Sequence, residues 1–291
     1  AADLDPLDVH VETATGGPLV HDDVAENRCY DWAHGDEGAT NAAFGAAAHT
    51  ATLELVDNRI ICNSMETRGC FADWVDDRLE FTVNGQGVWG TKSALAKALN
   101  LDAGAVRVVN PDVGGGFGMK SFDYPEYFIV ALAAKDLKRP VHWMSGRGEA
   151  MLSDNGGRDI VTRAEIAFDA DFRATALRIH SVSNLGAHCS GFAQFIQSDL
   201  ALKVLTGVYD IQTVWFHGEG VYTNTTPIGA YRGAGRPEAI YGMERLMDVA
   251  ARQLGQDPIA LRRKNFIRAD QMPYTSAAGE IYDVGDFHRV L

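Results

Sequence analysis

Residues 109–120, VNPDVGGGFGMK, place four glycines around one phenylalanine. The stretch before them, AVRVVNP, favours a strand, and residues 123–138, DYPEYFIVALAAKDLK, favour a helix. Glycine loses more backbone freedom on folding than any other residue, so a glycine run here indicates unusual dihedral angles or a very close approach of the backbone to another group. The fold must therefore bring something against this loop.

Three kinds of ligand compete as explanations of the loop. A nucleotide P-loop has its lysine directly after the last glycine, whereas Met119 separates Gly118 from Lys120. A dinucleotide fingerprint accommodates Gly114 and Gly116 but finds Met119 at its last position. The third explanation is an anion or oxo ligand held by backbone N–H groups at the entrance of a helix, and the sequence is compatible with it.

A second glycine-rich stretch, residues 226–238, TPIGAYRGAGRPE, also precedes a helical pattern. It carries Tyr231, Arg232 and Arg236 among its glycines. A surface salt bridge is the alternative explanation for Arg232. Two such loops, one with arginines, predict that both face a common bound anion.

The remaining pattern mixes strands and helices without regular alternation. A capping role is expected for Asp123 ahead of the helix that contains Pro125, and for Asp257 ahead of a last helix. We predict an α+β fold of mixed sheets with packed helices. The expected strands are 46–56, further strands within 61–86, 105–111, 140–144, a hairpin over 162–188 and 214–224, and the expected helices are 91–101, 123–138, 238–254 and 257–266.

Composition excludes several classes of partner. The net charge of −13 argues against nucleic acid and against anionic membranes. No apolar run approaches the roughly 20 residues that span a bilayer. The four cysteines are scattered, which favours reduced thiols in a cytoplasmic protein, and no Cys or His pair has the spacing of a zinc site.

Several segments together resemble one protein family. VRVVNPDVGGGFGMK, GAYRGAGRPEA, DPIALRRKNF, NGQGVWGTKSALAKALN and the pentapeptide METRG at 65–69 are similar to the large, molybdenum-binding subunit of the xanthine oxidase family of molybdenum hydroxylases. The greatest similarity is to the aerobic carbon monoxide dehydrogenase large-subunit group, in its AYRGAGR-type branch. The resemblance implies that residues 27–291 are the first half of the molybdenum cofactor-binding domain. Residues 1–26 are then a linker or the tail of an upstream domain.

The resemblance also implies roles for the first loop. Gln86 would hydrogen-bond an oxygen ligand on the metal through its amide. Phe117 and Gly118 would line the metal's face with backbone N–H groups, and Gly115 and Gly116 would complete the cofactor-binding loop. Molybdenum is expected to take no ligand directly from a side chain.

In the second loop, the resemblance places Arg232 beside the pterin and the metal, where it would stabilise developing negative charge. Gly233 and Ala234 would shape the substrate side. Copper-holding members have a cysteine where this chain has Gly233. Purine-oxidising members have a glutamate where it has Ser121 and a phenylalanine where it has Ala234. Carbon monoxide and xanthine are therefore not expected as substrates.

The implied cofactor is molybdopterin with molybdenum, in the cytosine dinucleotide form, with iron–sulfur clusters and FAD on partner subunits. The implied reaction is hydroxylation of an aldehyde or N-heterocycle with oxygen from water. The family's general base is a glutamate expected beyond Leu291, in a missing second half of the subunit. Glu219, in HGEG, is interpreted as a structural or surface residue. We expect the fragment alone to be inactive, and the alternative is a non-catalytic scaffold that binds no pterin.

Overall fold

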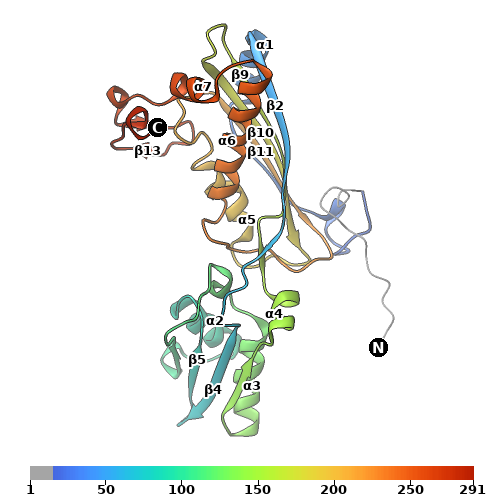
Figure 1. Ribbon diagram of the computed structural model, residues 1–291. Helices are drawn as coiled ribbons and strands as arrows, with labels where there is room; N and C mark the ends of the chain where they lie inside the picture. The colour runs from blue at the N-terminus through green and yellow to red at the C-terminus, as the bar shows by residue number, and fades with distance from the viewer. Residues whose placement is uncertain (1–15) are drawn as a thin grey trace.

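The computed structural model describes residues 16–291 and arranges them in two lobes (Figure 1). The expected linker at 1–26 lies partly outside these residues. The upper lobe is built on a five-stranded sheet in the order β1-β11-β10-β9-β2. Its strands are β1 (Arg28–Gly35), β2 (His49–Asp57), β9 (Ile160–Phe168), β10 (Ala174–Gly186) and β11 (Val214–Tyr222). All neighbouring pairs are antiparallel except β10 and β11.

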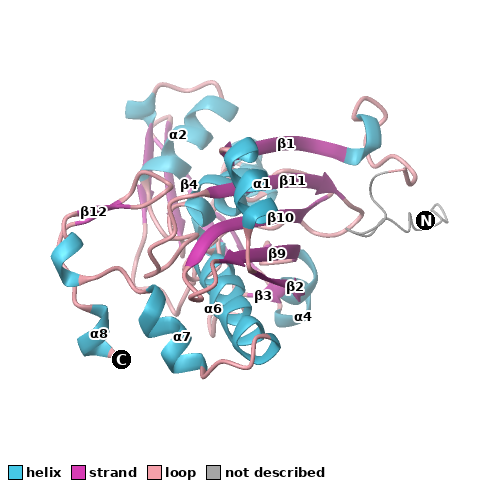
Figure 2. Ribbon diagram, turned by 90° about the horizontal axis from the view of Figure 1, so that it is seen from above, coloured by secondary structure: helices cyan, strands magenta, loops and turns pink. Residues whose placement is uncertain are grey.

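One face of this sheet packs against α6 (Arg236–Gln253), and α7 (Pro258–Asn265) follows beside it. Met243, Leu246, Met247 and Ala250 of α6 are buried at the spacing of one helical face. On the opposite face, α1 (Glu37–Ala46) lies over β10 and β11 (Figure 2). The sheet is thus covered on both sides near one end.

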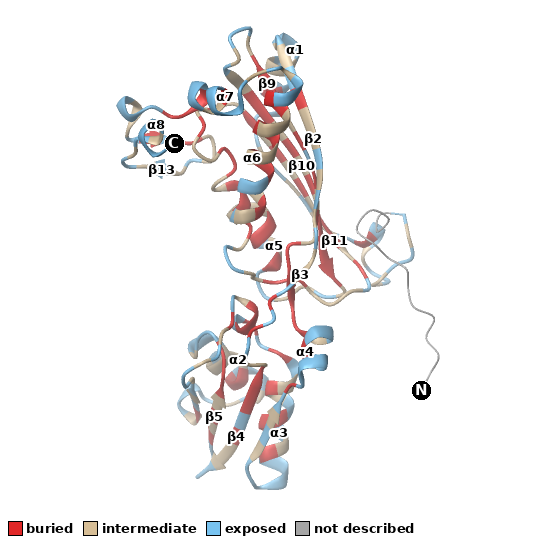
Figure 3. Cartoon of the chain, viewed as in Figure 1, coloured by how far each residue is buried: buried red, intermediate tan, exposed pale blue. Residues whose placement is uncertain are grey.

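The lower lobe has a four-stranded sheet and a second hydrophobic core. Leu79, Phe81, Leu95, Tyr127 and Ala131 are almost completely buried there. Figure 3 shows buried residues in both lobes. The elements of this lobe are β4 (Gly69–Val75), β5 (Arg78–Val83), β6 (Val106–Val109), β7 (Val141–Met144), α2 (Trp89–Ala98) and α3 (Pro125–Leu137), with sheet order β6-β5-β4-β7.

The chain passes between the lobes on two adjacent segments. β3 (Ile60–Ile61), which leads into the lower lobe, pairs antiparallel with β8 (Gly156–Gly157), which leads back. The lower lobe is therefore an insertion between β2 and β9. Since the two glycine-rich loops belong to different lobes, their relation depends on this junction. The short helix α4 (Arg147–Ser153) precedes β8.

The predicted α+β class is confirmed, and most of the expected elements are present. Asp123 is a correction: α3 is preceded by Tyr124 without a side-chain cap, and the Asp123 carboxylate accepts a hydrogen bond from Thr91 instead. α6 begins at Arg236, two residues earlier than expected, because Pro237 fits the first turn of a helix. The smaller elements are α5 (Ala193–Phe195), β12 (Tyr274–Thr275), β13 (Ile281–Tyr282) and α8 (Phe287–Val290).

Helices α1 and α4 have no counterpart in the sequence prediction. In α1 the alanines and glycines form no apolar stripe, and only Thr40 is buried. Its N-terminus is nevertheless capped by Asp36, whose carboxylate accepts from the Ala39 amide. Among residues 16–291, none of the helices combines the length and apolarity needed to cross a membrane.

Candidate functional site

The first glycine loop packs tightly against its surroundings. A Cβ on Gly116 would lie 2.4 Å from Oε1 of Gln86, and a Cβ on Gly118 would lie 2.4 Å from the carbonyl oxygen of Ala230. Gly118 also has a φ of 103°, which L-residues rarely adopt. Gly118 is therefore required by the neighbouring backbone before any ligand is considered, whereas a side chain at Gly116 would displace the Gln86 amide.

Gln86 lies in the turn between β5 and α2 and is exposed. Its Oε1 accepts a 2.8 Å hydrogen bond from the Gly118 amide, and its own backbone N–H donates to the Lys120 carbonyl at 3.0 Å. These bonds orient the side-chain amide. Its Nε2 group makes no hydrogen bond with residues 16–291, so it remains a free donor. The N–H of Gly118, which we expected to face a metal ligand, is directed at Gln86.

A backbone hydrogen bond joins the two loops. The amide of Arg232 donates to the carbonyl of Phe117 at 2.9 Å. Phe117 has a φ of 54° and its side chain remains 44% exposed. Residues from different lobes and 115 positions apart (232 − 117) are thereby adjacent. The structure brings Gln86, Gly115, Gly116, Phe117, Gly118 and Arg232 together, and Gly233 and Ala234 follow directly.

The guanidinium of Arg232 is exposed and has no hydrogen bond or ion pair with any described residue. The salt bridge considered as its alternative explanation is thus not formed within residues 16–291. Gly233 and Ala234 have φ values of 99° and 46°, so this loop turns sharply just before α6. Arg236 donates to the Gly233 carbonyl at 3.2 Å, which leaves Arg232 as the loop's free cation among the described residues.

An ion pair between the buried Lys120 and the partly buried Glu66 supports the first loop. The Lys120 side chain is fully buried, and its Nζ lies 2.9 Å from Oε2 of Glu66. The same Glu66 oxygen accepts from the Gly114 amide at 2.9 Å. Burial alone raises the pKa of Glu66, but its hydrogen bonds with Lys120 and Gly114 bring this pKa below its ordinary value.

A second ion pair supports the other loop. Arg158 is 7% exposed and donates to the carbonyls of Tyr231 at 3.3 Å and Arg232 at 3.0 Å, and to Glu238 at 3.0 Å. Its guanidinium also lies 4.7 Å from the centre of the Tyr231 ring. Burial raises the pKa of the Glu238 carboxyl, although the positive charge of Arg158 opposes that rise. Oε2 of Glu238 has no hydrogen-bond partner among the described residues.

Sequence reasoning missed both supporting pairs. In the sequence, Glu66 was noted only as part of the METRG segment. Lys120 was considered only as the possible lysine of a P-loop. Arg158 carried no sequence signal, since its partners lie 73 to 80 positions away. Glu219 lies on the outer face of β11 in an ion pair with Arg28, away from both loops. Its side chain is 14% exposed and ion-paired, so of the two interpretations, a structural or a surface residue, the structure favours the structural one.

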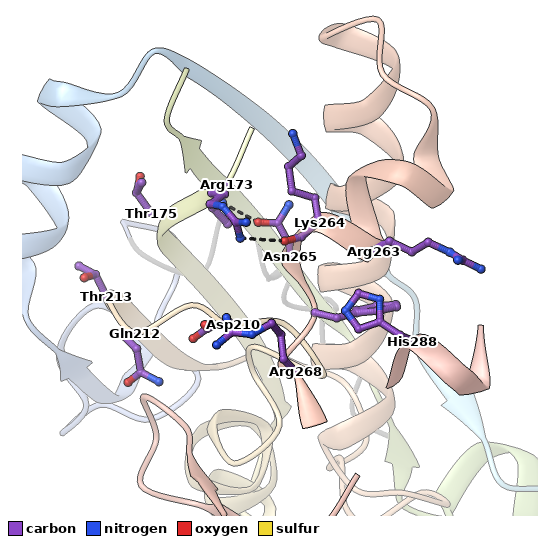
Figure 4. Close-up of a pocket in the computed structure, with 12 residues that line it drawn as sticks. Arg173, Thr175, Asp210, Gln212, Thr213, Arg263, Lys264, Asn265, Arg268 and His288 are labelled. Atoms are coloured by element: carbon purple, nitrogen blue, oxygen red, sulfur yellow. Dashed lines mark hydrogen bonds between the residues drawn. The ribbon is translucent and has the colours of Figure 1, made fainter. Parts of the chain in front are cut away.

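A separate cavity of about 490 Å³ lies in the upper lobe (Figure 4). Its lining includes Arg173, Asp210, Asn265 and His288, and none of the predicted site residues. Figure 4 shows Lys264 and Arg263 pointing away from one another. Three of its basic side chains bond other protein groups: Arg173 the Lys264 carbonyl, Lys264 the Asp171 carbonyl, and Arg268 the Asp270 carboxylate.

The paired loops have the donor chemistry that a molybdenum–pterin cofactor requires. The Nε2 group of Gln86 and the guanidinium of Arg232 are unpaired donors among residues 16–291, and both residues bond the backbone of the first glycine loop, Gln86 at Gly118 and Arg232 at Phe117. Oxo and dithiolene groups are acceptors with negative charge, which such donors complement. The residues present therefore fit the group.

These features describe a two-lobed domain whose two glycine-rich loops meet at the junction of the lobes, and the comparisons with known proteins identify its class. A family model, "Molybdopterin cofactor-binding domain", matches residues 20–266. The chain belongs to this family, and its resemblance to the large subunits of the xanthine oxidase family is confirmed.

Relatives and solved structures show how far the likeness extends. The nicotine 6-hydroxylase large subunit of Paenarthrobacter nicotinovorans is 35% identical over 87% of this chain and 31% of its own length. The carbon monoxide dehydrogenase large chain of Hydrogenophaga pseudoflava is 33% identical over 99% and 38%. The structure of quinoline 2-oxidoreductase from Pseudomonas putida 86 has a TM-score of 0.91 at 29% identity, over 98% of this chain and 37% of that one. The chain thus spans about a third of each relative.

Proposed function

We propose that the chain forms the molybdopterin-facing part of an oxidoreductase that hydroxylates an organic substrate. The observation that supports the proposal is the contact between the two loops: the Gln86 side chain accepts from the Gly118 amide, and the Arg232 amide donates to the Phe117 carbonyl. Family membership supports molybdopterin with molybdenum as the cofactor. The scaffold alternative is disfavoured, because the donors of the site are present and unpaired.

When bound, this cofactor supplies two-electron oxidation of a carbon–hydrogen bond with oxygen derived from water. The chain's own residues would do the placement. Gln86, held through Oε1 by Gly118, would present its Nε2 hydrogens to an oxygen of the cofactor. Arg232 would hold a fixed positive charge where negative charge develops, which stabilises the transition state most in a shielded site.

The substrate class remains a proposal: an aldehyde or an N-heterocycle. The N-heterocycle is supported by the names of two relatives, the nicotine 6-hydroxylase and the quinoline 2-oxidoreductase. Copper-assisted carbon monoxide oxidation is disfavoured by Gly233. Its φ is 99°, and a Cβ there would lie 2.3 Å from Cγ of Pro237, so a copper-holding cysteine has no room in this backbone.

Four further features belong to the same proposal. The proposed cofactor is the cytosine dinucleotide form of molybdopterin. The proposed iron–sulfur and FAD centres are on partner subunits. The relatives' names "large subunit" and "large chain" support a multi-subunit assembly. We place the protein in the cytoplasm, supported by the free thiols of Cys62 and Cys70. The division into residues 1–26 and 27–291 stays a prediction.

Gln86→Glu tests the proposal in the complete assembly. A glutamate keeps an acceptor for the Gly118 amide but removes the free N–H donor and adds a charge. We expect turnover to fall at least about tenfold, the effect of losing one hydrogen bond worth roughly 1.4 kcal/mol in the transition state, while the melting temperature and molybdenum content change little. Gln253→Glu, at an exposed position outside the site, is the matched control.

Two results would contradict the proposal. A mature, correctly assembled protein without molybdenum, measured by elemental analysis, would remove the cofactor. Full turnover in Gln86→Glu with normal molybdenum content would contradict the role proposed for Gln86. The proposed cofactor would be unaffected by that result.

A further inference from the structure

A cluster of histidines and carboxylates lies on the outer face of the upper sheet, apart from the two loops. His180 of β10 stands opposite His217 of β11 in the parallel register, and Asp31 of β1 stands opposite Glu219 of β11. Because side chains alternate along a strand, His217 and Glu219 share one face. That face is the one turned away from α6, since the neighbouring Val214 and Phe216 of β11 are in the core.

The potential ligand atoms are already close together. One nitrogen from each of His180 and His217 and an oxygen of Glu219 lie within 4.8 Å of one another. Nε2 of His180 is 2.8 Å from Oε1 of Glu219, and Nε2 of His217 is 2.7 Å from Oδ1 of Asp31. Around a tetrahedral zinc ion with bonds of about 2.1 Å, ligand atoms are about 3.4 Å apart. Small side-chain rotations therefore convert this arrangement into a coordination sphere.

Arg28 orients both carboxylates. Its Nε lies 3.3 Å from Oε2 of Glu219 and its Nη1 lies 3.4 Å from Oδ2 of Asp31. Each carboxylate thus turns one oxygen to the guanidinium and the other to an imidazole. A ligating carboxylate that is hydrogen-bonded in this way by an outer residue is typical of metal sites.

The charge and exposure of the cluster also suit a cation. Two carboxylates, Asp31 and Glu219, and the guanidinium of Arg28 leave a net charge of −1 beside the two imidazoles. The Glu219 side chain is 14% exposed, whereas His180 is 45% exposed. One side of the cluster is shielded by protein and the other is open to water, which can supply a remaining ligand.

We propose that His180, His217 and Glu219 bind one divalent transition-metal ion, with Asp31 as a fourth ligand or as the hydrogen-bond acceptor of His217. Two imidazoles and a carboxylate suit Zn²⁺, Co²⁺, Ni²⁺ or Cu²⁺, and are a poor set for Mg²⁺ or Ca²⁺, which prefer oxygen ligands throughout. The ion would link β1, β10 and β11 across the sheet. Sequence spacing gave no zinc signal because His180 and His217 meet only through the pairing of β10 with β11.

The test is zinc titration of the complete, untagged protein after dialysis against a chelator, followed by isothermal calorimetry. We expect the parent protein to bind one more zinc ion per chain than the His180→Ala/His217→Ala double variant. Each single histidine variant, and Glu219→Gln, should weaken this binding at least tenfold. His142→Ala, an exposed histidine of β7 in the other lobe, should leave it within twofold. Excess Mg²⁺ should not compete.

Loading with Cu²⁺ provides an independent reading of the ligands. Its electron paramagnetic resonance spectrum should show two imidazole nitrogens in the parent and one in His217→Ala. Circular dichroism will establish that the variants are folded. If an alanine variant does not fold, the more conservative Glu219→Gln variant takes its place in the test. Equal zinc binding by the parent and the double variant, or no zinc binding by the parent, would overturn the site.

Discussion

At the scale of single residues, the site depends on positions that carry no side chain. Gly116 and Gly118 lie against Gln86 and Ala230 at distances that exclude a Cβ. Their absence of a side chain lets Gln86 bond the backbone and keep its Nε2 group free. The function proposed for Gln86 therefore requires these two glycines.

Gly118→Ala should lower the free energy of unfolding by at least about 2 kcal/mol, because a positive φ costs an L-residue roughly 1–2 kcal/mol and the new methyl group meets the Ala230 carbonyl. Urea unfolding measures the change. Gly90→Ala is the control, since nothing lies within 4 Å of its Cβ position and α2 favours alanine. An unchanged stability in Gly118→Ala would show that the loops are not in contact.

At the scale of elements, two ion pairs, each with a buried cation, fix the loops to their neighbours. Glu66 and Lys120 hold the first loop to the segment before β4. Arg158, which follows β8, and Glu238, in the first turn of α6, hold the second loop between them. One side chain of each pair also bonds the backbone of its loop: Glu66 accepts from the Gly114 amide, and Arg158 donates to the carbonyls of Tyr231 and Arg232. These bonds hold the loop conformation through protein contacts alone.

Arg158→Met should destabilise the protein by about 3–5 kcal/mol, because Glu238 is then a buried charge without a partner. The double variant Arg158→Met/Glu238→Leu removes that charge and should recover most of the loss. Turnover should stay low in both, since the carbonyls of Tyr231 and Arg232 are no longer held. Turnover that recovers together with stability would mean that Arg158 has no positioning role.

The Glu66 carboxylate should make stability depend on acid pH. Its pKa is lowered in the folded protein, so its contribution is fully present above its ordinary value of 4.5 and is lost as the pH falls through the lower folded value. Urea unfolding from pH 7 down to pH 3 should show the difference between the parent and Glu66→Gln shrink below about pH 4.5. If the stability difference between the parent and Glu66→Gln is constant over this pH range, it does not come from the charge of the Glu66 carboxylate.

At the scale of the whole molecule, the chain has two hydrophobic cores joined at β3 and β8. The proposed cofactor site lies where the lobes meet, with the first loop from one and the second from the other. Binding a rigid group there would link the lobes, which is a general property of sites between structural units.

Leu246→Ala should loosen the upper lobe selectively. This leucine is fully buried against the five-stranded sheet, and its truncation should cost about 2–5 kcal/mol. Hydrogen–deuterium exchange should increase in β9 and β10 and remain unchanged in β4 and β5, and Leu79→Ala should give the reverse pattern. Equal loss of protection in both lobes by either variant would show a single cooperative unit.

The sequence predicted regular elements wherever local chemistry was strong. Asp257 and Pro258 located the start of α7, and the end of the second glycine-rich loop located the start of α6 to within two residues. It failed where the deciding contact was distant or weak. Asp123 has the right residue type for a cap, but Thr91 takes its carboxylate. The apolar face of α1 is too small to give a period, although Phe44 packs beside Arg178 of β10.

The sequence by itself determined the family, the α+β class and the identity of the two glycine loops, because these depend on residue types in fixed local order. Only the tertiary structure decided that Arg232 meets Phe117, that Arg158 supports the second loop and that His180 stands beside His217. The physical reason is that these contacts join segments tens to more than a hundred residues apart. Such contacts are fixed by strand pairing and by the packing of two cores, which no local pattern records.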